Sequence, residues 1–221
     1  MKKLALIHTV KPGYLRFGEE IKRAIPDLMI VNILDDELAR EAVEEGVSPH
    51  LNNRFLMAAK MAESAGADLI VCACTSMIPV IDYAKPFLDT PLILIDDEMH
   101  RCAAEMGDRV TVFATAESAL IPTVKKFRET SERLGRGNKQ IRTLVCPEAN
   151  AYMREGNMAR HDEIVLEAIR QVRDSDIVIL SQYSITHLTP QLEQLCGCKV
   201  LGNGEYCIQE IKRHLNIASA E

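Results

Sequence analysis

The stretch Asp68-Leu-Ile-Val-Cys-Ala-Cys-Thr-Ser76 joins a short apolar run to small polar residues. Apolar runs of this length are typical of strands that are buried on both faces of a parallel sheet. Similar runs occur at residues 4–7, 92–95, 110–113 and 177–180, and weaker ones at 28–33, 140–145 and 198–201. Amphipathic helical patterns lie between the runs, for example over 51–65 and 164–172. This alternation predicts an α/β fold, in which a ligand binds at the carboxyl ends of the strands.

The chain contains an approximate internal repeat. Residues 174–184 resemble residues 66–76, and the strand that ends at Thr115 resembles the strand that ends at Thr9. One such match is expected because buried strands look alike, but two matches at nearly the same offset favour a duplication. We therefore predict two similar Rossmann-like halves with parallel sheets and a cleft between them. Their expected ranges are residues 1–102 with 204–221, and residues 103–203.

Composition and charge exclude several classes of function. The 221 residues carry a formal net charge of −6 with scattered Lys and Arg, which argues against a nucleic-acid partner. No apolar run approaches the roughly 20 residues of a membrane span. The apolar stretch after Lys2-Lys3 ends at Val10 without a small-residue cleavage site, so it is interpreted as a first strand and not as a signal peptide. We expect a cytoplasmic protein whose seven cysteines are free thiols.

Cys74 is the main candidate for a reactive group. It follows a strand, and Thr75-Ser76 and then Pro79 are suited to the cap and first turn of a helix. The positive end of a helix dipole favours a thiolate, which acts as a general base or as a nucleophile. The N–H groups at such a helix start also bind carboxylates. The alternative is a buried core cysteine, and Cys-Thr-Ser alone has low specificity.

Two Cys-x-Cys pairs raise the question of a metal site. These are Cys72 with Cys74 and Cys196 with Cys198. Zinc sites normally add a second such pair or histidines, and nothing in the sequence completes a set of four ligands. We predict no metal site. The remaining cysteines are interpreted as packing residues: Cys102, Cys146 and Cys207.

The stretch 68–76 resembles the first catalytic-cysteine motif of the aspartate/glutamate/hydantoin racemase superfamily, in which a strand ends in Ala-Cys-(Asn/Thr)-(Thr/Ser). Residues 90–98 and 107–115 resemble the superfamily's mid-chain pattern, and residues 176–184 occupy the place of its second cysteine motif. The resemblance covers nearly the whole chain. It implies an enzyme that uses neither metal nor pyridoxal phosphate, with pseudo-twofold-related halves and one cysteine from each half flanking the substrate α-carbon. Relatives include maleate isomerase and arylmalonate decarboxylase.

The sequence departs from the racemase pattern at the second cysteine, where it has Gln182. A glutamine only donates and accepts hydrogen bonds, so a symmetric two-thiol racemase is not expected. The resemblance then implies a racemase or isomerase that acts at the α-carbon of a small carboxylic or amino acid with Cys74 as its only thiol. One alternative is a decarboxylase or other lyase of a malonate-like acid. The other is a carboxylate-binding protein without turnover.

Position in the fold and the resemblance together assign substrate binding to a set of polar residues at the strand ends: His8, Thr9, Thr75, Ser76, Thr115, Gln182, Tyr183 and Ser184. Structural or capping roles are the alternative for each of them. His8 and Tyr183 are the nearest candidates to replace the missing second cysteine. Racemases of this architecture often form dimers, so the resemblance also favours a homodimer.

Overall fold

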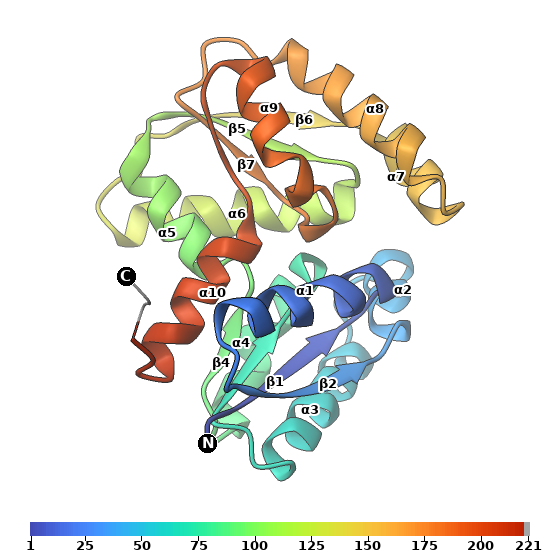
Figure 1. Cartoon of the computed structure of the whole chain (residues 1–221), viewed down its shortest axis with the longest axis vertical. Helices are drawn as coiled ribbons and strands as arrows, with labels where there is room; N and C mark the ends of the chain where they lie inside the picture. The colour runs from blue at the N-terminus through green and yellow to red at the C-terminus, as the bar shows by residue number, and fades with distance from the viewer. Residues whose placement is uncertain (219–221) are drawn as a thin grey trace. The chain divides into compact units, whose positions relative to one another are not determined.

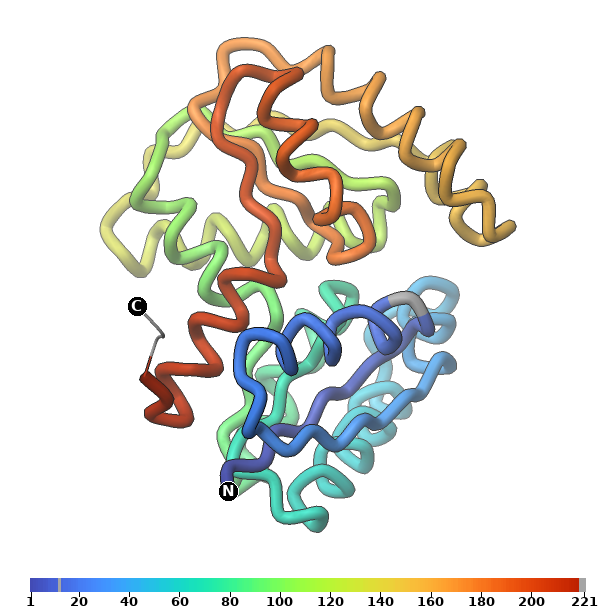
Figure 2. Tube along the Cα trace, in the orientation of Figure 1, coloured from blue at the N-terminus to red at the C-terminus, as the bar shows by residue number. Residues whose placement is uncertain are grey.

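The structure is a computed structural model that describes residues 1–218, without the side chain of Pro12 (Figures 1 and 2). The chain divides into two compact units. One contains Met1–Asp97 together with the segment from Gly204 onward, and the other contains Glu98–Asn203. The boundary between the two halves was expected between residues 102 and 103, which lie within helix α5, Asp97–Met106. In the structure the first unit ends at Asp97, at the start of this helix.

The first unit is built on four parallel strands in the order β2-β1-β3-β4. The strands are β1 Lys3–His8, β2 Met29–Leu34, β3 Leu69–Cys72 and β4 Leu92–Leu94. The helices are α1 Lys11–Ala24, α2 Glu37–Glu44, α3 Pro49–Ser64, α4 Ile78–Ala84 and α10 Asn203–His214, with 3-10 turns η1 Thr75–Met77 and η2 Lys85–Phe87.

The second unit repeats this arrangement with four parallel strands in the order β6-β5-β7-β8. The strands are β5 Arg109–Ala114, β6 Gln140–Val145, β7 Ile177–Leu180 and β8 Lys199–Leu201. Besides α5, its helices are α6 Glu117–Arg133, α7 Pro147–Arg154, α8 Met158–Ala168 and α9 Thr189–Cys196, with 3-10 turns η3 Ile169–Gln171 and η4 Tyr183–Leu188.

The matching strand orders confirm the predicted α/β fold with parallel sheets. In each sheet the first strand lies between the second and the third. The chain therefore crosses from the first strand to the second in one direction, and from the second back past the first to the third in the other. Right-handed crossovers in opposite directions place the connecting helices on opposite faces of the sheet. Such a reversal creates a crevice outside the carboxyl ends of the two central strands. These strands are β1 and β3 in the first unit, and β5 and β7 in the second.

The helix α3 shows how local sequence builds the core of the first unit. The Ser48 side chain caps the helix by accepting a hydrogen bond from Leu51 N at 3.0 Å, and Pro49 lies in the first turn. The predicted apolar face of α3, including Leu51 and Phe55, is buried against Ala5 and other residues of one sheet face. In the part of the chain that is described, no helix is long and apolar enough to cross a membrane.

Two aspartates tie the central strands together at their amino ends. Asp68, just before β3, accepts hydrogen bonds from Lys3 N at 2.8 Å and from Lys2 Nζ at 3.2 Å. Asp176, just before β7, accepts from Arg109 N at 2.8 Å and from the Arg109 guanidinium at 2.6 and 3.0 Å. Each aspartate precedes its central strand in the repeated motif, so the repeat preserves a contact that sets the register of β1 with β3 and of β5 with β7.

Candidate active site

Cys74 lies two residues beyond β3, at the carboxyl edge of the first sheet. Its backbone is extended (φ −145°, ψ 116°) and it occupies the N-cap position of η1, which leads into α4 with Pro79 in the first turn. Ala73 N donates to Ile7 O at 2.9 Å, which holds this segment beside the end of β1. The strand order therefore brings the Cys74 segment next to His8 and Thr9.

The pKa of the Cys74 thiol lies above its ordinary value. Burial is the main cause, and the Asp96 carboxylate adds to it. The neighbouring Thr9 hydroxyl and hydrogen bonding by Ser76 act in the opposite direction. The expected stabilisation of the thiolate by the start of the helix is present at Ser76, but burial outweighs it. Cys74 is therefore in the thiol form at neutral pH.

Thr75, an expected substrate contact, also forms a hydrogen bond within the protein. Its Oγ1 donates a buried hydrogen bond to Asp96 Oδ2 at 2.8 Å. Asp96 follows β4, so this bond connects the segment after β3 with the segment after β4. The hydroxyl of Thr75 is occupied by the protein itself, whereas Ser76 is only half-buried and lies beside the thiol.

His8 ends β1 and is 1% exposed. Its Nε2 lies 3.0 Å from Asn32 Oδ1 of β2, and its ring makes an edge contact with Tyr14 at 5.6 Å. Burial lowers the pKa of His8, so the imidazole is neutral at pH 7. With Asn32 Oδ1 as the acceptor, Nε2 carries the proton and Nδ1 keeps a free lone pair. Among the described residues, none forms a hydrogen bond with this buried Nδ1, which lies near Gly13 of α1.

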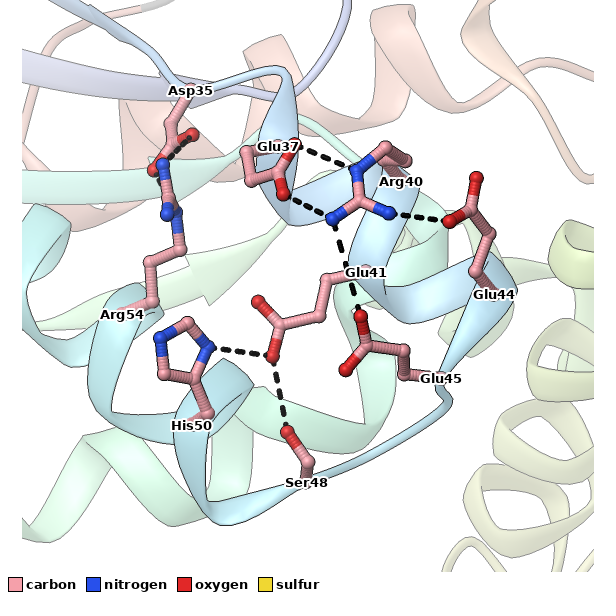
Figure 3. Close-up of polar contacts among 9 residues, drawn as sticks. All are labelled: Asp35, Glu37, Arg40, Glu41, Glu44, Glu45, Ser48, His50 and Arg54. Carbon is pink, nitrogen blue, oxygen red and sulfur yellow. Dashed lines mark hydrogen bonds and ion pairs between the residues drawn. The ribbon is translucent and has the colours of Figure 1, made fainter.

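A polar network fixes helix α2, which contacts η1 beside Cys74. Glu41 is 2% exposed and accepts hydrogen bonds from Ser48 Oγ at 3.1 Å and from His50 Nδ1 at 2.9 Å (Figure 3). Next to it, the guanidinium of Arg54 forms a two-pronged ion pair with Asp35 at 2.7 and 2.9 Å. These contacts join α2 and the end of β2 to α3, which holds the surroundings of Cys74 in place.

Gln182 occupies the corresponding position in the second unit. It lies two residues beyond β7, with an extended backbone (φ −137°, ψ 134°) and the N-cap position of η4. Its Oε1 accepts hydrogen bonds from Thr115 N at 2.7 Å and from Thr115 Oγ1 at 3.0 Å. A backbone N–H only donates, so the amide oxygen must face Thr115. The Nε2 group then keeps its two donors, for which the described residues supply no acceptor.

The two threonines form a matched pair. Thr9 follows β1 and lies beside Cys74, and Thr115 follows β5 and holds Gln182. Thr115 is fully buried and its hydroxyl is used in this contact. It therefore holds the Gln182 side chain in place. The fixed amide of Gln182 then presents N–H groups where the repeat places a thiol in the first unit.

The other predicted residues of the second unit lie along η4. Tyr183 is mostly buried, and the Oγ atom of Ser184 is buried without a hydrogen-bond partner among the described residues. The same holds for Ser181 Oγ, which the sequence analysis did not single out. The structure thus groups His8, Thr9, Thr75 and Ser76 with Cys74 in the first unit. It groups the rest of the predicted set in the second unit: Thr115, Gln182, Tyr183 and Ser184.

Asn32 and Asp96 are site neighbours that sequence reasoning missed. Asp96 carried a usable signal, since it follows an apolar strand-like run. Asn32 carried none, because its contact with His8 depends on the register of β1 with β2, where Leu6 pairs with Asn32. Within the described residues, no group of three or more His, Cys, Asp or Glu side chains is arranged to hold a metal ion.

The family model for Asp/Glu/hydantoin racemases matches residues 19–211. The chain belongs to the Asp/Glu/hydantoin racemase family. Its fold is similar to that of a glutamate racemase isoform from Bacillus anthracis, with 17% identity and a TM-score of 0.75, covering 100% of this chain and 85% of that one. It is similarly close to an aspartate racemase from Picrophilus torridus, with 16% identity, a TM-score of 0.75 and coverage of 100% and 96%.

A third similar structure is an aspartate racemase homologue from Pyrococcus horikoshii, with 22% identity, a TM-score of 0.68 and coverage of 97% of this chain and 100% of that one. No curated protein matches the sequence significantly. Identities this low show the shared fold, and the family model shows the membership. The chain is thus an enzyme of the racemase type, an isomerase family that acts on small amino acids.

Proposed function

We propose that this family member acts at the α-carbon of a small carboxylic or amino acid without a cofactor, with Cys74 as its single catalytic thiol. The observation that carries the proposal is the orientation of the Gln182 amide. Two hydrogen bonds from Thr115 hold Oε1, which leaves Nε2–H as a donor at the place of the second thiol. A glutamine fixed in this way stabilises negative charge on an oxygen and transfers no proton.

The reaction passes through an enediolate. The thiolate of Cys74 removes the α-proton, and the electron pair moves into the adjacent carboxylate. Gln182 Nε2 donates to an oxygen of the substrate carboxylate, and this hydrogen bond strengthens as negative charge develops. The Cys74 thiol then returns a proton to the same face of that carbon, which exchanges the α-hydrogen and retains the configuration. Inversion would need a second proton carrier, which this proposal does not assign. In this proposal Thr9 and Ser76 contact the substrate beside the thiol, and the free Nδ1 of His8 accepts a hydrogen bond from a substrate N–H or O–H group.

One observation favours a decarboxylase as the second candidate. The pKa of Cys74 is raised, so the resting group is an acid. A malonate-like acid that loses carbon dioxide leaves the same enediolate, to which the Cys74 S–H delivers its proton. Water then reprotonates the thiolate. Decarboxylation followed by protonation starts from the Cys74 thiol, which dominates at neutral pH, whereas removal of an α-proton requires the less populated thiolate.

Proton NMR in D2O tests both reactions on one panel: aspartate, glutamate, hydantoins, maleate and 2-substituted malonates. We expect deuterium at an α-carbon or loss of carbon dioxide for at least one acid, with both abolished by Cys74→Ala. Cys102→Ser is the matched control, because Cys102 is also half-buried but lies within helix α5. Activity that survives Cys74→Ala contradicts the proposal. Binding of these acids without any reaction supports a carboxylate-binding protein.

The pH dependence separates the two candidates. Because the pKa of Cys74 is raised, its thiolate accumulates only above the ordinary thiol range. Proton removal therefore accelerates as the pH rises toward that pKa, whereas protonation after decarboxylation slows as the thiol is lost. We also propose a homodimer, by analogy with other racemases of this architecture, which sedimentation analysis tests.

A further inference from the structure

Cys196 and Cys198 lie together at the end of α9. The helix ends at Cys196, and Gly197 adopts a left-handed conformation (φ 71°, ψ 18°) with its N–H donating to Glu193 O at 2.9 Å. Cys198 then leads into β8. This turn brings Cys196 Sγ to 3.5 Å from Cys198 Sγ. Both residues are only partly buried, against the edge of the second unit's core.

Spacing alone does not produce this contact. Cys72 and Cys74 have the same Cys-x-Cys spacing, but Cys74 is extended and Cys72 Sγ approaches Cys74 O at 3.7 Å. Cys72 is also fully buried. Within the described chain, only the pair at the end of α9 has a contact between two sulfur atoms. The left-handed Gly197 is the feature that distinguishes the two pairs.

We propose that Cys196 and Cys198 form a redox-active dithiol that closes to an intramolecular disulfide by exchange with a small disulfide such as oxidised glutathione. The sulfur atoms must approach from 3.5 Å to the bonded distance of about 2.05 Å, a shift within reach of side-chain rotation at a helix end. The pair is unsuited to zinc, because the described residues supply no third ligand beside it.

The exchange is balanced in two steps. One cysteine thiolate attacks a sulfur of oxidised glutathione, which forms a mixed disulfide and releases one glutathione thiolate. The second cysteine loses its proton to water, attacks the protein sulfur of the mixed disulfide and releases the second glutathione thiolate. The protein loses two hydrogens and two electrons, and one oxidised glutathione becomes two reduced molecules. Because the second thiol is already adjacent, ring closure competes effectively with a second glutathione.

The electrostatic surroundings of this pair raise the pKa of the Cys198 thiol. Burial, the neighbouring Cys196 thiol and the carboxylates of Asp176 and Glu193 raise the pKa of Cys198 to about 12. Lys199 partly offsets Glu193 through an ion pair at 2.9 Å. Because the thiol pKa is raised, little Cys198 thiolate is present at neutral pH, and its attack on another disulfide is slow. A disulfide is a strong oxidant where the reduced form is stabilised as a thiolate, and this stabilisation is missing here. The disulfide therefore forms slowly and persists once formed.

Peptide mass spectrometry tests the proposal directly. Trypsin cleaves after Arg173 and Lys199, so residues 174–199 form one peptide whose only cysteines are Cys196 and Cys198. The folded protein is incubated with oxidised glutathione at pH 8, quenched with acid, alkylated and digested. We expect this peptide to lose two hydrogens, with the internal disulfide exceeding the glutathione adduct by about tenfold or more because closure is intramolecular.

Single variants provide the controls. Cys196→Ser and Cys198→Ser should each stop at the mixed disulfide, and Cys102→Ser should behave as the wild type. Gly197→Ala should lower the ratio of internal disulfide to adduct, because alanine is strained at this backbone conformation. A peptide that stays fully reduced, or that carries two glutathione molecules, overturns the proposal. So does an equal yield of disulfide between Cys72 and Cys74, which fall on a separate peptide.

Discussion

The substitution Gln182→Glu separates the role of the amide from its role in folding. A glutamate at this position still accepts both hydrogen bonds from Thr115, at 2.7 and 3.0 Å in the parent protein. Hydrogen bonds to a charged acceptor are at least as strong as those to an amide, so the free energy of unfolding should be unchanged or slightly raised. The second carboxylate oxygen, however, replaces the Nε2–H donors with a negative charge.

The expected loss of activity follows from the chemistry of the site. Removing a donor aimed at a developing oxyanion costs about 3 kcal/mol, on the order of 10²-fold in rate. Repulsion between two carboxylates adds to this loss. Thr115→Val removes only the hydroxyl bond and keeps the backbone N–H bond, so we expect a smaller loss of about 1 kcal/mol, or roughly fivefold. The rates are measured by NMR on the acid that reacts in the D2O panel.

The control for charge is Gln191→Glu, which makes the same chemical change at an exposed position of α9. It should leave both activity and thermal stability as in the wild type. A Gln182→Glu variant that folds and keeps wild-type activity refutes the assigned role of the amide. A variant that loses activity together with its stability refutes the argument that Thr115 donates its hydrogen bonds to the carboxylate as it does to the amide.

Three further predictions concern stability. Thr75→Val leaves the buried Asp96 carboxylate without one donor and should lower the free energy of unfolding by about 2 kcal/mol in urea, whereas Thr75→Ser should retain most of it. Gly107→Ala places its Cβ 2.7 Å from Asp176 Cβ, so thermal unfolding should show a loss of about 1–3 kcal/mol from overpacking. The pKa of Asp176 is lowered to about 2 from 3.8, so its stabilising effect is complete above pH 4 and declines as the pH falls toward 2. Acid titration of stability should therefore be flatter in Asp176→Asn than in the wild type.

The strands were predictable because each buried strand of a parallel sheet needs apolar residues on both faces. Even the three-residue β8 coincides with the weak run at 198–201. The rule that ligands bind at carboxyl strand ends directed attention to Cys74 and Gln182, which the structure places two residues beyond β3 and β7. Their N-cap positions were not predicted, since Thr75 and Ser76 were expected as the cap and lie within η1. The strands and the residues that follow them depend on the local sequence and on the repeat, so a single sequence carries them.

The parts of the site that were not predictable depend on contacts between distant segments. The hydroxyl of Thr75 donates to Asp96, which is 21 residues away, and no local motif predicts this contact. The pKa of Cys74 is governed by burial, which no local motif records. The orientation of the Gln182 amide depends on Thr115, 67 residues earlier in the chain. Sequence therefore placed the candidate residues at the strand ends, whereas their hydrogen bonding and protonation required the folded structure.

The most direct test of single-face chemistry at Cys74 follows the configuration of the substrate during deuterium exchange. One enantiomer of the reacting amino or carboxylic acid is incubated with the enzyme in D2O, and each enantiomer is then separated and its deuterium content measured. Because Gln182 transfers no proton, we predict that deuterium accumulates in the starting enantiomer with its configuration retained. Rapid appearance of the deuterated opposite enantiomer would reveal a second proton carrier on the other face and contradict the assignment of Cys74 as the only one.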